Sequence, residues 1–165
     1  MYRKIVFFTS LLVFTILIQL WASSSTAHAQ DPTQSWTTSS SLSTIVANHT
    51  TVSYNNYLYS LGGSTIDDFS IIQRASIGSD GSLGSWTNFY DLPSTSYYHS
   101  TVLNGNRIYV LGGTQYPPVN SKDTVLSATV NTDGSISGWT TLSQLPKRLS
   151  KGKAIIINNR IYFVG

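Results

Sequence analysis

The residues of this 165-residue chain that could do chemistry are mostly tyrosines and aspartates in the loops between apparent strands. A tyrosine ring can stack on the apolar face of a sugar or peptide, while a nearby carboxylate orients its polar groups. We therefore predict a ligand-binding loop surface that comprises Asp67, Asp68, Tyr90, Tyr97, Tyr98 and Tyr116. The alternative is that Tyr97 and Tyr98 pack between structural units and that the other residues lie in solvated loops.

The composition provides few residues that could act in catalysis or bind a metal. The chain has no cysteine and no glutamate, which removes disulfides, thiolate ligands and cysteine nucleophiles. His49 and His99 each stand alone in the sequence, whereas a metal site needs converging ligands. The Asp67-Asp68 pair lacks the ligand spacing of a calcium loop. We expect no metal, no cofactor and no catalytic residue, with both histidines in structural roles.

Positive charge is concentrated in one loop near the C-terminus. The formal net charge is +3, and two of the ten basic residues, Arg3 and Lys4, belong to the leader described below. The remaining cluster lacks interleaved aromatic residues and the broad basic footprint of a nucleic-acid site, so we expect a solvated loop rim and no nucleic-acid partner. This cluster consists of Lys147, Arg148, Lys151 and Lys153.

The N-terminus has the order of a secretory signal peptide. Arg3 and Lys4 precede an apolar stretch over residues 5–21, which the small-x-small triplet Ala27-His28-Ala29 follows. This order predicts a signal helix within residues 1–29, cleavage after Ala29, and a secreted or cell-surface protein. The alternative is an uncleaved membrane anchor, because the apolar stretch is just short of the about 20 residues that span a bilayer.

The mature part of the chain repeats itself. A Gly-Gly motif follows an apolar strand, and its first glycine recurs as Gly62, Gly112 and Gly165, in steps of 50 and 53 residues. Tryptophans keep the same steps, at Trp36, Trp86 and Trp139. An Asp-Gly-Ser triplet precedes the last two, at 80–82 and 133–135. Three markers with one period indicate structural repeats.

Each repeat is predicted to form four antiparallel strands. Asn55-Asn56, Gly105-Asn106 and Asn158-Asn159 fall at equivalent positions and tolerate the positive φ of tight hairpins. We predict two four-stranded blades near 45–88 and 99–141, and a hairpin near 153–164. In the first blade, Asp80-Gly81 should turn the chain into a fourth strand that carries Trp86. Residues 30–44 are predicted to form a flanking strand, because Trp36 is equivalent to Trp86.

Four strands per unit, a Gly-Gly pair and a late tryptophan resemble the kelch repeat, and the Asp-Gly-Ser hairpin resembles a bacterial-type subgroup. Kelch repeats also carry a tyrosine between the Gly pair and the tryptophan, and the windows 71–76 and 124–129 have none. The resemblance covers residues 30–165, with repeats at 36–85, 86–138 and 139–165. It implies an all-β, kelch-like β-propeller with two full blades and part of a third. Propellers close with about four to eight blades, so downstream blades would be needed to close the ring.

The resemblance implies a binding module for a protein or carbohydrate ligand. The copper-dependent galactose oxidase type uses a Cys-Tyr cofactor, which a chain without cysteine cannot form. The alternative is part of a secreted sugar-active enzyme, similar to the mutarotase type, with catalytic residues in other blades. Beyond this ligand we expect membrane contact only through an uncleaved leader.

Overall fold

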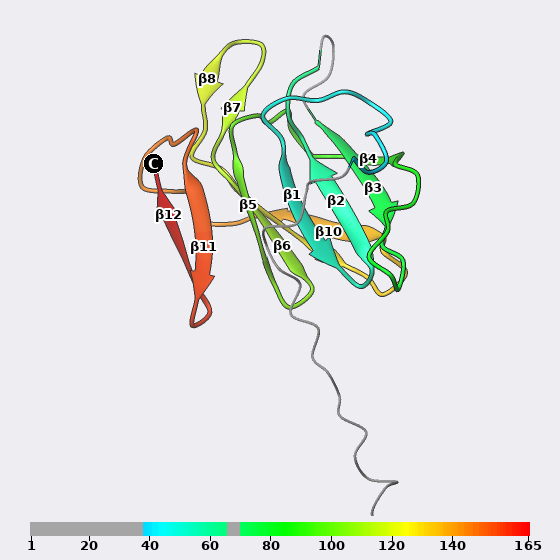
Figure 1. Ribbon diagram of the computed structural model, residues 1–165. Helices are drawn as coiled ribbons and strands as arrows, with labels where there is room; N and C mark the ends of the chain where they lie inside the picture. Colours follow the sequence, from blue (N-terminus) through cyan, green and yellow to red (C-terminus); the bar gives the residue numbers. More distant parts are fainter. Residues whose placement is uncertain (1–37, 66–69) are drawn as a thin grey trace, which may run out of the picture. The chain divides into compact units, whose positions relative to one another are not determined.

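The part of the chain that the computed structural model describes, residues 38–65 and 70–165, is built from β-strands and loops, with no helix in these two ranges (Figure 1). The predicted all-β class is therefore confirmed for this part. The predicted signal peptide, with Ala27 and Ala29, and the aspartates Asp67 and Asp68 lie outside the described residues. Within the described ranges, no helix is long and apolar enough to cross a membrane.

Two four-stranded antiparallel sheets follow one another along the chain. The first sheet contains, in spatial and chain order, β1 (Thr50–Tyr54), β2 (Tyr57–Leu61), β3 (Ile71–Ser76) and β4 (Thr87–Asp91). The second sheet contains, in the same meander order, β5 (Ser100–Asn104), β6 (Arg107–Leu111), β9 (Val125–Val130) and β10 (Ile136–Thr141). The C-terminal hairpin pairs β11 (Lys153–Ile157) with β12 (Arg160–Val164). The predicted groups of strands are confirmed.

The tight turns form where the sequence places asparagine and glycine. Asn55 and Asn56 have φ values of 45° and 58°, and Asn158 and Asn159 have 50° and 61°. Gly105 has a φ of 57°. Both turn residues have positive φ in the first and third hairpins, whereas only the first turn residue, Gly105, does in the second. Both arrangements match the right-handed twist of the strands they connect, which explains why each hairpin is so short.

The Asp-Gly-Ser triplets form the same turn in both sheets. The Asp80 carboxylate accepts the Ser82 N–H at 3.0 Å and the Ser82 hydroxyl at 2.7 Å. Asp133 and Ser135 repeat these bonds at 2.9 and 2.7 Å. These hydrogen bonds to the ionised form lower the pKa of both aspartates.

Two local predictions about strands do not hold over the described residues. β4 begins at Thr87, so Trp86 precedes the fourth strand, although the equivalent Trp139 lies inside β10. Of the predicted flanking strand over 30–44, residues 30–37 with Trp36 lie outside the described residues, and residues 38–44 form no strand. Instead, the Thr44 N–H donates to the side-chain oxygen of Gln73 at 2.8 Å, and the Gln73 amide donates to the Thr44 carbonyl at 2.8 Å. The buried amide of Gln73 thus takes the backbone groups that a strand would have paired.

An additional small hairpin accounts for the longer second period. Eleven residues separate Leu61 from its neighbour Ile72, whereas fourteen separate Leu111 from the equivalent Val125. The longer loop contains β7 (Thr114–Gln115) and β8 (Asn120–Ser121), with a cis peptide bond between Pro117 and Pro118. The sequence analysis predicted only an irregular loop here.

The core lies between successive sheets and repeats its register. We call the side of a sheet that is turned toward the following unit its forward face, and the opposite side its backward face. The forward face of the first sheet packs against the backward face of the second, through Tyr59, Leu61 and Ile72 on one side and Ile108, Val110 and Leu126 on the other. The forward face of the second sheet packs against the hairpin in the same way, through Val102, Leu111 and Val125 on one side and Ile156, Ile161 and Phe163 on the other.

The Gly-Gly pair lets the loop between two sheets approach the end of the second strand. Gly62 has a φ of +58°, and a Cβ there would lie 2.5 Å from the Ser96 carbonyl oxygen. The Gly63 N–H donates to that same carbonyl at 2.9 Å, and the Gly113 N–H donates to the equivalent Leu149 carbonyl at 2.8 Å. The recurring glycines therefore anchor each sheet to the loop that leads into the next unit.

Candidate functional site

The first strands of the three units, β1, β5 and β11, are adjacent in sequence order. The Thr50 hydroxyl lies 2.9 Å from Nε2 of His99 and 2.6 Å from the Thr101 hydroxyl, which connects β1 to the start of β5. The Ser100 hydroxyl accepts the Ala154 N–H at 2.8 Å and connects β5 to β11. The residues that directly precede these three strands therefore lie close to one another.

The residue two positions before each first strand has a left-handed backbone. Asn48, Tyr98 and Lys151 have φ values of 60°, 56° and 62°, and they are equivalent under the repeat. The Tyr98 N–H donates to the Asn48 carbonyl at 3.2 Å, and the Lys151 N–H donates to the Tyr98 carbonyl at 2.8 Å. Because a bulky residue rarely adopts this conformation, these bonds between units are what hold Tyr98 in place.

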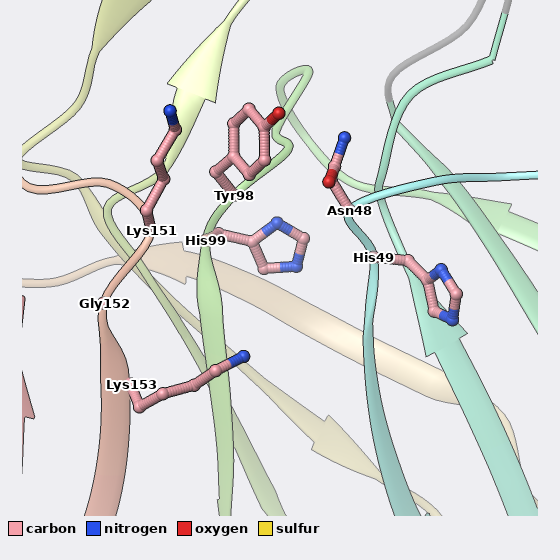
Figure 2. A pocket seen from close by; sticks show the side chains of 7 residues that line it. All are labelled: Asn48, His49, Tyr98, His99, Lys151, Gly152 and Lys153. Carbon is pink, nitrogen blue, oxygen red and sulfur yellow. The ribbon is translucent and has the colours of Figure 1, made fainter.

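A pocket of about 290 Å³ opens over this series of residues (Figure 2). Its lining comes from all three units and consists of Asn48, His49, Tyr98, His99, Lys151, Gly152 and Lys153. The first six are the same pair of positions taken from three successive repeats, and Lys153 is the first residue of β11. The repeat itself thus builds the pocket.

The pocket is electropositive. Among the seven described residues that line it, two are lysines and none is acidic. The Lys151 ammonium lies 4.9 Å from the centroid of the half-buried Tyr98 ring, within the range of a cation–π contact.

His99 is neutral at physiological pH despite its polar surroundings. Burial, and next the positive charge of Lys122, lower the pKa of its imidazole to about 4. Lys122 is itself buried, and its ammonium donates to the Ser94 hydroxyl at 2.8 Å and the Thr95 carbonyl at 3.1 Å. Burial also lowers the pKa of Lys122. The buried ammonium of Lys122 and the neutral imidazole of His99 therefore lie behind the surface of the pocket.

The structure places the predicted site residues at several locations. Tyr98 lines the pocket, and the Tyr97 ring lies 5.1 Å from the Tyr98 ring while its backbone pairs with Thr114. Tyr90 lies on β4, at the edge of the first sheet opposite β1, and lines a separate hollow of about 350 Å³. Tyr116 is exposed in the β7–β8 loop, where its N–H meets the Thr95 hydroxyl at 3.5 Å.

Of the seven described residues that line the pocket, only Tyr98 was predicted as a site residue; His49 and His99 were assigned structural roles, and Gly152 was not singled out. Asn48 was not singled out as a site residue, while Lys151 and Lys153 were assigned to a solvated loop rim; both lysines are indeed exposed. The register of the repeat could have identified them, because Asn48, Tyr98 and Lys151 follow one another in steps of 50 and 53 residues and so occupy equivalent positions.

The side chains that line the pocket can bind a ligand through hydrogen bonds, charge and ring contacts. Across residues 38–65 and 70–165, no group of three or more histidines and carboxylates is placed to hold a metal ion. The pocket provides an aromatic ring, a side-chain amide and two ammonium groups, which suit a ligand that carries hydroxyls and negative charge. The chain matches no protein-family model and no curated protein, so this geometry carries the functional argument.

Proposed function

We propose that this chain is an exported, kelch-like β-propeller module that binds a protein or carbohydrate ligand at the pocket over its first strands. The four-stranded meanders, the adjacent first strands and the repeated register of their packing support the propeller arrangement. Further blades would complete the ring. The order of charged, apolar and small residues in 1–29 supports export.

One observation carries the binding proposal: equivalent residues from three successive repeats converge on one pocket. Structural packing alone would let the repeat keep a single residue type at these positions. Instead, Asn48, Tyr98 and Lys151 share a backbone conformation and differ in chemistry. A fixed backbone with varied side chains is how loops on a rigid scaffold acquire a binding function.

The test is a binding map on the full chain, labelled with ¹⁵N and titrated with a panel of monosaccharides and short peptides. The proposal predicts that at least one of these ligands shifts the amide resonances of residues 48, 98 and 151. Tyr98→Asn places the residue of the first repeat at the same left-handed position and should weaken that ligand about tenfold or more by removing the ring. Tyr162→Asn, which removes an exposed tyrosine from β12, is the matched control. Shifts that never include the pocket amides, or equal affinity of the two variants, would contradict the proposal.

A further inference from the structure

We infer that the pocket recognises a carboxylate-bearing sugar of about one ring, and that Lys151 and Lys153 bind its negative charge. This inference rests on the proposed function, because it names the ligand class of the same pocket. It follows from the charge of the pocket, from its size, and from a comparison among the repeats.

Lys151 and Lys153 bring positive charge to the pocket. Figure 2 shows Lys153 extending into the pocket beneath His99, with Lys151 beside the Tyr98 ring at the rim. Within residues 38–65 and 70–165, no carboxylate lines the pocket, and the buried Lys122 acts on His99 from behind with the same sign. Like charges gathered in a hollow raise a positive potential, which a bound anion relieves.

The size argument restricts what the anion is attached to. A volume of about 290 Å³ lies at the lower end of small-molecule pockets, which begin near about 300 Å³. The half-buried ring of Tyr98 offers a stacking surface, and the Asn48 amide can both donate to and accept from hydroxyl groups. A single sugar ring with one carboxylate uses all of these groups.

The comparison among repeats shows that the two lysines are not needed by the fold. The residues equivalent to Lys151 are Asn48 and Tyr98, and those equivalent to Lys153 are Thr50 and Ser100. Asparagine is several-fold enriched at positive φ, so a lysine at a φ of 62° replaces a residue better suited to that backbone. Both positions are cationic in the repeat whose two side chains line the same pocket, and ligand binding accounts for this.

The experiment titrates the full chain with glucuronate and with glucose at low and at high ionic strength, and follows the amide resonances of the pocket. The inference predicts that glucuronate binds at least tenfold more tightly than glucose and that its affinity falls as salt screens the charges. Acetate separates the two sources of a carboxylate. If acetate binds as tightly as glucuronate, the sugar is not recognised and the inference is wrong.

The variants replace each lysine by its repeat equivalent, so that the backbone preference is kept. Lys151→Asn and Lys153→Thr should each weaken glucuronate binding about three- to tenfold, the scale of one ordinary hydrogen bond made in exchange for hydrogen bonds to water, and leave glucose unchanged. Lys147→Gln removes an exposed lysine outside the pocket and should change neither ligand. Thermal unfolding of each variant confirms that the fold is intact.

The outcomes distinguish a failure of the charge inference from a failure of the proposed binding function. Equal affinity for glucose and glucuronate, or unchanged glucuronate binding in both lysine variants, overturns the charge inference and leaves the binding module in place. The charge inference also fails alone if neither sugar binds while another ligand of the panel shifts residues 48, 98 and 151. If no ligand of the panel shifts these residues, both proposals fail.

Discussion

Leu111 and Val164 occupy the same place in successive repeats, 53 residues apart, and have opposite environments. Leu111, on the forward face of the second sheet, is 2% exposed, whereas Val164, on the forward face of the hairpin, is 74% exposed. Val102 and Ile155 show the same contrast, at 8% and 56%. The repeat therefore determines which side of a sheet is apolar, and the neighbouring unit determines whether that side is buried.

The backward faces make the same point from the other side. Val110 and its equivalent Phe163 both pack against the unit before them, although one belongs to a four-stranded sheet and the other to a hairpin. Stability in such an array is a sum of terms between neighbours. Equivalent substitutions in two repeats should accordingly have unequal costs.

The largest expected effect tests this contrast directly. Leu111→Ala should lower the free energy of unfolding by about 2–5 kcal/mol, because it removes buried methyl groups and leaves a cavity. Val164→Ala should change it by about 0.5 kcal/mol or less, because the side chain is already in solvent. Urea unfolding of both variants measures the two values. Equal losses would show that the hairpin face is covered and that the contrast is false.

The second effect is a pH dependence that belongs to His99 and not to its repeat equivalent Gly152. The pKa of His99 is about 4 in the folded chain and about 6.5 when unfolded, so the unfolded state takes up the proton first as the pH falls. Stability from this group is present above about pH 6.5 and is lost toward pH 4, by on the order of 3 kcal/mol. The electrostatic interactions of His99 with Lys122 and with His49 both lower the pKa of His99, in the same direction as burial.

The measurement compares unfolding of the unmodified chain and of His99→Asn at pH 7.5 and pH 4.5. Groups that do not interact with His99 titrate equally in both proteins, so their contributions cancel. The variant should lose distinctly less stability between the two pH values. Identical losses would mean that His99 is not buried as a neutral ring.

The third effect isolates the close approach at the Gly-Gly pair. Gly62 and Gly105 have φ values of +58° and +57°, but a Cβ would meet the Ser96 carbonyl at Gly62 and nothing within 4 Å at Gly105. Both Gly→Ala substitutions carry the cost of positive φ, so their difference reports the steric clash. Gly62→Ala should be about 1–3 kcal/mol worse in denaturant unfolding. Equal costs would show that the loop between the sheets does not approach Gly62.

Whether a feature of the fold or of the pocket could be predicted from the sequence depends on how far apart in the sequence the interacting residues are. The strands of the two four-stranded sheets and the C-terminal hairpin follow from local patterns, such as Asn55-Asn56 and the Asp80 turn, and were predicted, whereas the small β7–β8 hairpin was not. The pairing of Thr44 with Gln73 joins a serine-rich segment to a buried amide 29 residues away, and no periodic pattern in the sequence predicts it. The register of Asn48, Tyr98 and Lys151 was present in the sequence, but its meaning depends on the first strands being adjacent.

That adjacency is the central claim, and a disulfide measures it most directly because the chain contains no cysteine. The hydroxyls of Thr50 and Thr101 lie 2.6 Å apart across β1 and β5, so Thr50→Cys with Thr101→Cys should form an intramolecular disulfide on mild oxidation. Thr51→Cys with Thr101→Cys is the control, since successive strand residues point to opposite faces. Mass spectrometry should find the 50–101 link in nearly all molecules and the 51–101 link in few. Equal yields for the two pairs, or no 50–101 link, would contradict the account.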